Sequence, residues 1–441
     1  MIKFFRKLWQ DRRGNALVIA GACLPMIVGA AGLASDTIQW TLWKRQLQRA
    51  ADSAAIAGVY ERQAASGATT TVGSVVSHDL TLNNHTWMSL VTGYPQVTYP
   101  ADTSTMTNQV HVTLAIQQRL PFSSMFMTAA PTIIANATAA SVPAGGDACI
   151  DARETSPSKT GVNITGNAGI YMPDCVIYSN SPATNSAAAG GSSNVVADSV
   201  ATVGGVQSSN NWHVNAYRPY SPPIPDPFAD VTPVPSDMNC ATKTVVQGGK
   251  NVTTSIGLDE NTDLSSLPSG TNCFTSLSVG SNKSLTLPPG TYYINGGDAF
   301  IQGDLTCNGC TIVLTNKDAS SPIGQFKVNA SSKINLTAPT DTTNPFRGIA
   351  IYQDRRATDS SPGNKINGNS ASQIIGALYF PSQELEYNGT GNTDAVCTMF
   401  VARRINFSGN SATTNKFKKL ADCGDVGLPS GGAIRMVRLV A

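Results

Sequence analysis

The carboxyl-terminal half of the chain contains one concentration of charged residues that could do chemistry. Its members are Asp354, Arg355, Arg356, Asp359, Glu384 and Glu386. Carboxylates beside arginines can act as acids, bases or Ca²⁺ ligands, as in grooves that cleave polysaccharides. Such residues also form solvated rims of ion pairs. We favour this second interpretation because the sequence has no Gly-x-Ser-x-Gly, no His-Glu-x-x-His and no phosphate-binding glycine loop. We therefore expect no catalytic, cofactor-binding or metal-binding residue.

Nine cysteines are the other reactive residues of the chain. Cys23 lies in a long uncharged run, and eight follow it: Cys149, Cys175, Cys240, Cys273, Cys307, Cys310, Cys397 and Cys423. An even number of cysteines in an oxidising compartment predicts disulfides. We predict the sequential pairs 149–175, 240–273, 307–310 and 397–423, because each closes a local loop. The third pair also has the spacing of a redox motif or of half a zinc site, but neither a thioredoxin-like context nor a second ligand pair accompanies it.

The composition of the 441 residues narrows the class of protein. Lys and Arg number 30 and Asp and Glu 28, a net charge of +2, which excludes the broad basic surface that nucleic acid requires. Only 13% of residues are charged, against about 25% in average soluble domains. A hydrophobic content of 41% excludes global disorder. We expect an anchored, mostly β protein with more than one folding unit.

The amino-terminal charge pattern is typical of a membrane anchor. Residues 1–13 carry five basic residues and one acidic residue, and residues 14–35 carry no charge. A helix of that length spans about 33 Å, enough for a bilayer core of about 30 Å. Because positive residues stay in the cytoplasm, we predict a single crossing through membrane lipid, with the amino terminus inside. A cleaved signal peptide is the alternative, which we disfavour because the run exceeds a typical h-region.

The same helix is predicted to continue beyond the membrane. Residues 36–65 contain no proline and one glycine. A stripe of mostly small residues follows one helical face, with Gly32 and Asp36 preceding it: Leu47, Ala50, Ala51, Ala54, Ala55 and Gly58. Such a stripe favours close packing, either against another helix or against the protein's own next domain. We expect these residues to form a helix-packing site.

Three segments of this region resemble a known family. They are Arg13-Gly14-Asn15-Ala16, Gly32-Leu33-Ala34-Ser35-Asp36 and Leu47–Gly58. With the intervening span that contains Pro25, they resemble the amino-terminal module of TadG-like (TadE/G-like) Flp pilus-assembly proteins. The resemblance implies a component of the tight-adherence system in the inner membrane of a bacterium, with other pilus-assembly proteins as partners.

Processing of the amino terminus is a further question that the family raises. Related small pseudopilins are cut after a glycine and carry Glu at the fifth mature position. Here Gly14 is followed at that position by Ile19. We therefore expect the bond between Gly14 and Asn15 to remain intact.

Residues 66–147 are predicted to form a small α+β region. Val72–His85 has a helical apolar pattern. Three β-type runs follow, the last two joined by an apolar connection at Leu120–Phe126: Gln96–Tyr99, Val110–Ile116 and Ile133–Ala139. A long helix that lies against a small antiparallel sheet is a pilin-like arrangement.

Residues 148–441 are predicted to form a mainly β domain. Four short echoes share an apolar residue, a polar residue, Gly and Asn or Asp: Ile164–Asn167, Ile301–Asp304, Ile366–Asn369 and Phe407–Asn410. Gly and Asn tolerate positive φ, so a strand can turn sharply at each echo. Short strands with such corners favour a right-handed parallel β-helix, with a β-sandwich as the alternative. We expect Cys423 and a final strand at 433–440 to cap this domain.

Two segments of the same domain have unusual composition. Ser179–Asn211 consists largely of small residues, and residues 217–235 include seven prolines. A proline-rich segment cannot form a helix or a central strand, so we predict an extended loop or linker at 217–235. A peptide ligand for a groove in a partner is the alternative.

These observations favour a non-enzymatic component of the pilus-assembly machinery. Two alternatives remain open. One is a surface adhesin whose β domain binds glycans, and the other is an envelope polysaccharide hydrolase or lyase. The oligomeric state and the partner are not determined by the sequence.

Overall fold

The computed structural model describes residues 14–83, 88–144, 146–248, 250–359, 363–368, 372–389, 397–409, 412–413, 420–428 and 434–440. The chain divides into two compact units. Unit 1 comprises Met1–Val142 and Val437–Ala441, and unit 2 comprises Pro143–Met436. The chain therefore enters unit 2 once and returns to unit 1 for its final strand. The basic segment 1–13, on which the predicted orientation depends, lies outside the described residues, as do His85, Asn369, Asn410 and Ala433.

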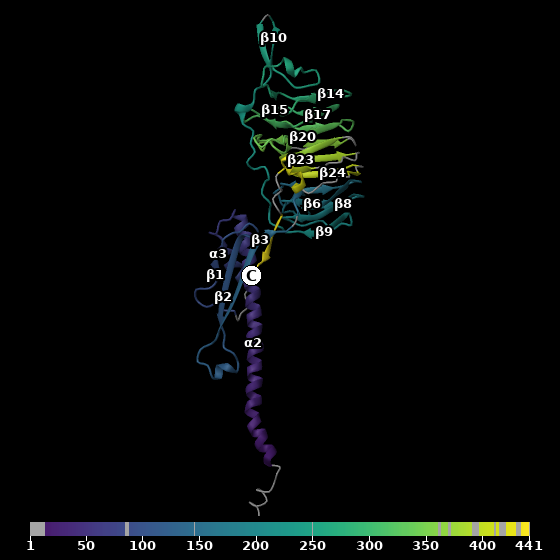
Figure 1. Ribbon diagram of the computed structural model, residues 1–441. Coiled ribbons are helices and arrows are strands. Elements are labelled where there is room, and N and C mark those ends of the chain that lie inside the picture. The colour runs from purple at the N-terminus through teal and green to yellow at the C-terminus, as the bar shows by residue number, and fades with distance from the viewer. Residues whose placement is uncertain are drawn as a thin grey trace, which may run out of the picture. The chain divides into compact units, whose positions relative to one another are not determined.

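Unit 1 combines helices with an antiparallel sheet (Figure 1). Its helices are α2 (Gly14–Ala64) and α3 (Val72–Leu82). The strand order is β1-β2-β3-β26, and β2 pairs antiparallel with both β1 and β3. The short helix η1 (Ser123–Met125) lies in the connection between β2 and β3. The strands are β1 (Gln96–Thr98), β2 (Thr107–Gln117), β3 (Thr132–Pro143) and β26 (Arg435–Leu439).

The core of unit 1 follows from the periodicity of its sequence. The 51 residues of α2 form one helix because Ala, the strongest helix former, is the commonest residue in it and Pro25 is its one internal proline. Strand β2 alternates, so that Val110, Val112 and Leu114 share one buried face. These side chains form one cluster with the buried residues of α2 and α3. The predicted helix over α2 and the predicted small sheet are thus both present.

Unit 2 is built of many short strands. The first group is β4 (Ala148–Ala152), β5 (Val162–Ile164), β6 (Gly169–Ser179), β7 (Ala187–Ala189), β8 (Asn194–Thr202) and β9 (Trp212–Arg218). A hairpin follows, β10 (Thr242–Gln247) and β11 (Lys250–Ser255), which pair antiparallel. Short helices lie at η2 (Pro235–Asp237), η3 (Leu264–Ser266) and η4 (Leu420–Val426).

The second group of strands makes up the rest of unit 2. It comprises β12 (Cys273–Phe274), β13 (Leu277–Val279), β14 (Ser284–Leu287), β15 (Gly290–Asn295), β16 (Ala299–Ile301), β17 (Asp304–Asn308) and β18 (Cys310–Thr315). It continues with β19 (Phe326–Val328), β20 (Ile334–Thr337), β21 (Ile349–Gln353), β22 (Asn364–Gly368), β23 (Gln373–Gly389), β24 (Thr398–Ser408) and β25 (Ala412–Thr413).

Parallel pairing with a step of three strands organises this second group. One ladder runs β12–β15–β18–β21, a second β13–β16–β19–β22, and a third β14–β17–β20–β23. Long strands β23 and β24 take part in more than one ladder. Unit 2 is therefore mostly β with a large parallel sheet, as predicted.

The first strands of unit 2 stack on its last strands. Strand β24 pairs in parallel with β23 and also with β4 and β5. The stack then continues through β6, β8 and β9 (Figure 1). The chain must therefore return from β9 to β12 before it can build the second group.

In-register columns of apolar side chains fill the interior of the stack. One column consists of buried residues at paired positions: Ile312, Ile351, Leu378, Phe400, Ile150 and Ile177. Two of the predicted glycine corners have positive φ, +70° at Gly166 and +96° at Gly409. Gly303 does not, and is required instead because a Cβ there would collide with the backbone carbonyl of Lys283.

The small-residue segment Ser179–Asn211 contains β7 and β8, whose Ala187, Ala189 and Ala197 are buried in the core. One expectation about the end of the chain needs correction. The final strand does not cap unit 2, because β26 pairs with β3 in unit 1. There it covers an edge that would otherwise be open, and Val437 packs against the core of unit 1.

Candidate functional site

The predicted packing stripe of α2 faces the sheet of unit 1. Five of its side chains are at most 5% exposed and belong to the core of unit 1: Leu47, Ala50, Ala51, Ala54 and Ala55. A Cβ added to Gly58 would lie 2.9 Å from Val110 Cγ1 and 3.2 Å from Val72 Cγ1. Small residues thus allow α2 to approach both β2 and α3 closely. The sequence left open whether the stripe packs against another helix or against the protein's own next domain. In the structure it packs against the protein's own sheet and α3.

Gly32 and Asp36 lie one turn apart on α2 and contact the connection between β2 and β3. The carboxylate of Asp36 is buried and accepts hydrogen bonds from the backbone N–H of Phe122, at 2.8 Å, and from the backbone N–H and hydroxyl of Ser123. A Cβ at Gly32 would collide with the ring of Phe122. These two residues therefore hold the connection rather than the sheet.

The amino-terminal half of α2 has an uncovered apolar surface. Six large side chains there are each more than half exposed: Ile19, Leu24, Met26, Ile27, Val28 and Leu33. Among the described residues, one helix, at Gly21–Ala64, is long and apolar enough to cross a membrane. This surface is compatible with a membrane anchor.

The eight cysteines after Cys23 come together in four pairs. The structure has disulfides at Cys149–Cys175, Cys240–Cys273, Cys307–Cys310 and Cys397–Cys423. This is the sequential pairing that the local loops predicted. Cys307 and Cys310 lie at the end of β17 and the start of β18, and no cluster of metal-ligating side chains occurs among the described residues. Cys23 is free and exposed on α2.

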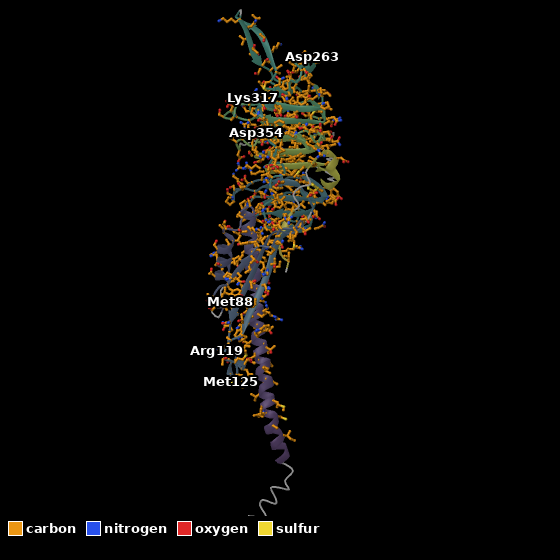
Figure 2. All side chains as sticks on the ribbon, turned by 60° about the vertical axis from the view of Figure 1, so that its left-hand side comes forward. Met88, Arg119, Met125, Asp263, Lys317 and Asp354 are labelled. Atoms are coloured by element: carbon orange, nitrogen blue, oxygen red, sulfur yellow. A yellow bond between two sulfur atoms is a disulfide. The ribbon has the colours of Figure 1, made fainter. Side chains whose placement is uncertain are left out.

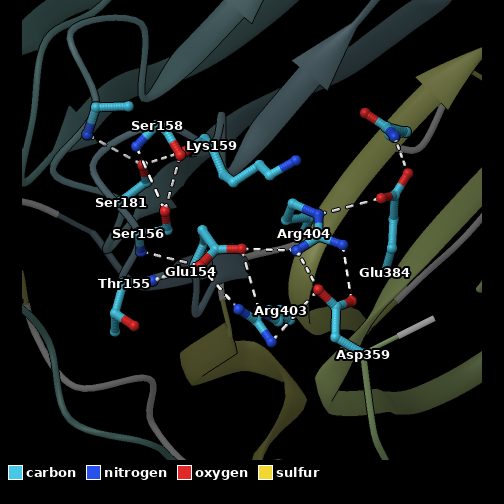
Figure 3. A network of polar contacts seen from close by, with 12 residues as sticks. Glu154, Thr155, Ser156, Ser158, Lys159, Ser181, Asp359, Glu384, Arg403 and Arg404 are labelled. Atoms are coloured by element: carbon cyan, nitrogen blue, oxygen red, sulfur yellow. Dashed lines mark hydrogen bonds and ion pairs between the residues drawn. The ribbon is translucent and has the colours of Figure 1, made fainter. Parts of the chain in front are cut away.

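A network of ion pairs joins the exit of β4 to β24 (Figure 3). Glu154 is buried, and one of its carboxylate oxygens lies 3.0 Å from Arg403 Nε and 2.7 Å from Arg404 Nη1. Its other oxygen accepts two backbone N–H groups, of Thr155 and Ser156, both at 2.9 Å. Every side of this carboxylate is therefore engaged.

Arg404 is the centre of the network. Besides Glu154, it binds both oxygens of Asp359, at 3.0 and 2.8 Å, and Glu384 at 3.1 Å. Burial acts to raise the pKa of Glu154, but the hydrogen bonds from Arg403 and Arg404 outweigh it and lower the pKa to about 2. Glu154 is thus ionised at neutral pH and is no general acid. The network holds strands together rather than presenting free carboxylates.

The other charged residues that sequence analysis singled out are also paired. Asp354 lies 2.7 Å from Arg356 Nη2 and accepts a hydrogen bond from Thr315 Oγ1 at 2.7 Å. Glu386 pairs with Lys365 at 3.1 Å. The predicted rim of ion pairs therefore describes these residues better than a catalytic groove does.

The proline segment, residues 217–235, lies along the outside of the stack. Tyr379 donates its hydroxyl hydrogen to Asp226 Oδ2 at 2.7 Å, and Tyr352 donates to the carbonyl of Val231 at 2.8 Å. The two tyrosines occupy paired positions on β23 and β21. The segment therefore crosses successive strands, and tyrosine hydroxyls hold it there.

Arg355 adds a second attachment for the proline segment. It donates to the carbonyls of Val231, at 2.7 Å, and of Phe228, and it lies 3.4 Å from Asp226. Prolines lack N–H groups, so a proline-rich segment binds chiefly through its carbonyls, and Arg355 supplies several donors at once. Between the end of β9 and the start of η2 the segment contains neither helix nor strand, as predicted for a loop, and it is attached to its own unit.

Asp151 is a buried charge that sequence analysis missed. Its side chain is 0% exposed, Arg153 Nη1 lies 3.1 Å from Oδ2, and Oδ1 has no hydrogen-bond partner among the described residues. Burial raises the pKa of Asp151 to about 6, although Arg153 opposes the shift. Nothing in the local sequence distinguishes this aspartate from a surface residue.

Comparison with known proteins finds one match. Residues 14–69 match the family model Tad, described as "Putative Flp pilus-assembly TadE/G-like". The resemblance read from the sequence is therefore confirmed for this segment, which comprises α2 and its exit turn. The match indicates a component of Flp pilus assembly with an amino-terminal apolar helix. No curated protein and no solved structure matches the chain.

The residues that sequence analysis missed were hidden by sequence distance. Glu154 and Arg404 are 250 positions apart and meet because β4 stacks on β24. Arg403-Arg404 within a strand was the one available signal, since partly buried arginines require carboxylate partners, and here both bind Glu154 and Asp359.

Proposed function

We propose that the protein is a non-enzymatic component of the tight-adherence (Flp) pilus-assembly machinery, anchored in a bacterial inner membrane by the apolar half of α2. One observation carries the proposal. The segment that matches the pilus-assembly family, residues 14–69, coincides with the helix whose amino-terminal half has an uncovered apolar surface. The basic residues before the uncharged run favour a cytoplasmic amino terminus, with the chain after Asp36 on the outer side.

Unit 2 is proposed to be a right-handed parallel β-helix rather than a β-sandwich. The parallel pairing, with a step of three strands in the three ladders of the second group, and the in-register apolar columns support this assignment. A sandwich of two antiparallel sheets would instead place sequential strands side by side. Stacked strands create long lateral faces, and such faces suit extended contacts with other proteins of the machinery.

Photo-crosslinking in native membranes tests the assembly role. Phe300 and Tyr171 are partly exposed on β16 and β6, so a photoreactive phenylalanine at either position samples a lateral face. Val246 on the hairpin is the control, because it is exposed but lies outside the stacked strands. We expect adducts with pilus-assembly proteins from the lateral positions, and loss of pili when the gene is deleted. Normal piliation of the deletion strain together with an absence of adducts would contradict the proposal.

Glycan binding is the second candidate function, and a pocket beside the hairpin favours it. The pocket has a volume of about 740 Å³. Its wall combines hydroxyl, amide and carboxylate groups with apolar side chains, including Asp259, Asn261, Thr262, Ile256 and Leu267. Sugars offer both polar edges and apolar faces to such a wall. Binding of a glycan panel to the purified full chain tests this candidate, and turnover of the same panel tests for a hydrolase or lyase, which we do not expect.

A further inference from the structure

The connection between β2 and β3 ends in an exposed apolar tip. Residues 120–130, here called the apolar loop, contain no charged residue. At the tip, Met125 is 76% exposed, Phe126 75% and Met127 51%. Three adjacent large apolar side chains on one loop constitute a surface that water solvates poorly.

The apolar loop is fixed to the helix that carries the proposed membrane span. Asp36 accepts the N–H groups of Phe122 and Ser123, and the ring of Phe122 lies against Gly32. Gly32 is four residues before Asp36, about 6 Å nearer the amino terminus along the helix axis. The loop therefore lies beside the last turns of the uncharged run at residues 14–35.

The backbone N–H groups at the tip of the loop are hydrogen-bonded within the protein. The N–H groups of Phe122 and Ser123 bind Asp36, and those of residues 124–127 bind carbonyls of Leu120, Phe122 and Ser123 at 2.9–3.1 Å. Six successive N–H groups thus have acceptors within the protein. Acceptors for these N–H groups meet one requirement for placing a non-helical segment in an apolar phase.

Charged and aromatic residues mark where the apolar surface ends. Arg119 directly precedes the loop, and Figure 2 shows it further from the amino-terminal end of α2 than Met125. On α2, Trp40 is 41% exposed and lies one turn beyond Asp36. Arginine and tryptophan at this level suit the headgroup region of a bilayer.

We propose that the apolar loop inserts its tip, Met125-Phe126-Met127, into the outer leaflet of the bilayer, on the side where the sheet of unit 1 lies. The proposal rests on the membrane anchoring proposed above. The loop and α2 then form two points of attachment to one membrane. Because Asp36 and Gly32 join the two points rigidly, the height of the sheet above the lipid is fixed, and α2 cannot rotate freely about its axis.

Depth-dependent quenching of a fluorophore measures insertion of the tip. The full chain, with Cys23→Ala, is placed in phosphatidylglycerol-containing vesicles, and an environment-sensitive nitrobenzoxadiazole label is attached at Phe126→Cys. Ile27→Cys labels the proposed span, and Ser104→Cys labels an exposed loop of the sheet. Quenching is compared between lipids with a nitroxide close to the headgroup and lipids with a nitroxide deep in the acyl chain.

The three labelled positions separate the loop proposal from the anchor proposal. We expect the label at position 126 to be quenched at least about twofold more by the shallow nitroxide than by the deep one, the label at 27 to be quenched by the deep one, and the label at 104 by neither. If position 27 is quenched and position 126 behaves like position 104, the loop proposal is overturned and the anchor stands. If position 27 also remains unquenched, the anchor proposal falls as well.

A pair of glycine variants tests whether docking on α2 positions the tip. Gly32→Leu forces the ring of Phe122 away from the helix, whereas Gly29→Leu has nothing within 4 Å to displace. We expect Gly32→Leu to change the quenching at position 126 and leave that at position 27 unchanged, and Gly29→Leu to change neither. Unchanged quenching at position 126 in Gly32→Leu would overturn the docking step.

Discussion

The helix of unit 1 packs through alanine and glycine, whereas the strands of unit 2 pack through large apolar side chains in registered columns. In unit 1, Ala51 and Ala54 are fully buried, and a Cβ added at Gly58 would lie 2.9 Å from Val110 Cγ1. In unit 2, the repeated strand geometry sets the distances, and isoleucine, leucine and phenylalanine occupy equivalent positions. Close approach therefore constrains residue identity more tightly than columnar stacking does.

The location of the family match agrees with this contrast. Residues 14–69 contain the small-residue face of α2 and match the pilus-assembly family. A helix that packs closely against its neighbours tolerates only small residues at the contact positions, whereas the core of stacked strands accepts many combinations of apolar residues. The two units also differ in disulfide content, because all four disulfides lie in unit 2 and the described residues of unit 1 contain none.

Removal of a disulfide should have the largest effect and should be confined to unit 2. Cys397→Ser with Cys423→Ser opens a loop of 26 residues, which we expect to cost unit 2 about 3 kcal/mol of unfolding free energy. Urea unfolding of the full chain in detergent, followed by proteolysis and peptide mapping, reports each unit separately. Cys23→Ser is the control and should change nothing. Equal loss of protection in unit 1 would show that the two units do not unfold independently.

A larger side chain at Gly58 should be the most damaging change in unit 1. Gly58→Leu must displace Val110 and Val72, and overpacking of this kind costs about 2 kcal/mol. Gly73→Leu on α3 is the matched control, because a Cβ there meets nothing within 4 Å. The same peptide mapping should show loss of protection in β2 for the first variant alone. Identical behaviour of the two variants would refute close packing as the constraint on unit 1.

The attachment of the proline segment should respond more weakly and locally. Arg355→Gln removes the bonds to Val231 and Phe228, which we expect to weaken attachment by about 1 kcal/mol at this partly exposed site. Limited proteolysis should then cut within residues 226–231 before the stack unfolds. Lys327→Gln, which breaks an exposed pair with Asp298, should leave this segment protected. Cutting at the same rate as in the unmodified protein would mean that the tyrosines alone hold the segment.

The buried Asp151 should give the smallest effect and an unusual pH dependence. Its pKa is about 6 in the folded state and about 3.8 in the unfolded chain, so the folded state binds the proton more tightly. Unit 2 should therefore lose stability as the pH rises from about 4 to 6. Asp151→Asn should lack this slope and gain on the order of 1 kcal/mol at pH 7, because the variant no longer buries an ionised carboxylate, although it also loses the ion pair with Arg153. A slope that persists in Asp151→Asn would assign it to another group.

The same contrast explains which features could be predicted from the sequence. Local patterns sufficed for α2, for the alternation of β2, and for the glycine corners at Gly166 and Gly409, because each depends on neighbouring residues. The sequential disulfides were also accessible, since each closes a short loop.

Features that depend on distant residues could not be predicted. The stacking of β4 on β24 brings Glu154 to Arg404 across 250 positions, and no local signal marks that register. The destination of β26 was predicted wrongly, because a short terminal strand can complete any free edge and nothing in its own sequence selects β3. The burial of Ala187 and Ala197 could not be predicted either, since a run of small residues does not show which of them face the core.

A topology measurement tests the central claim most directly, namely that the amino-terminal half of α2 lies in lipid while its carboxyl-terminal half packs on the sheet of unit 1 on the outer side. Two reporters are fused in turn to the end of the full chain, one an enzyme active only outside the cytoplasm and the other a fluorescent protein that matures only inside it. The account predicts activity of the first and no fluorescence from the second, with the protein retained in the inner-membrane fraction after alkaline extraction. Fluorescence with no enzyme activity, or release of the intact chain from the membrane, would contradict it.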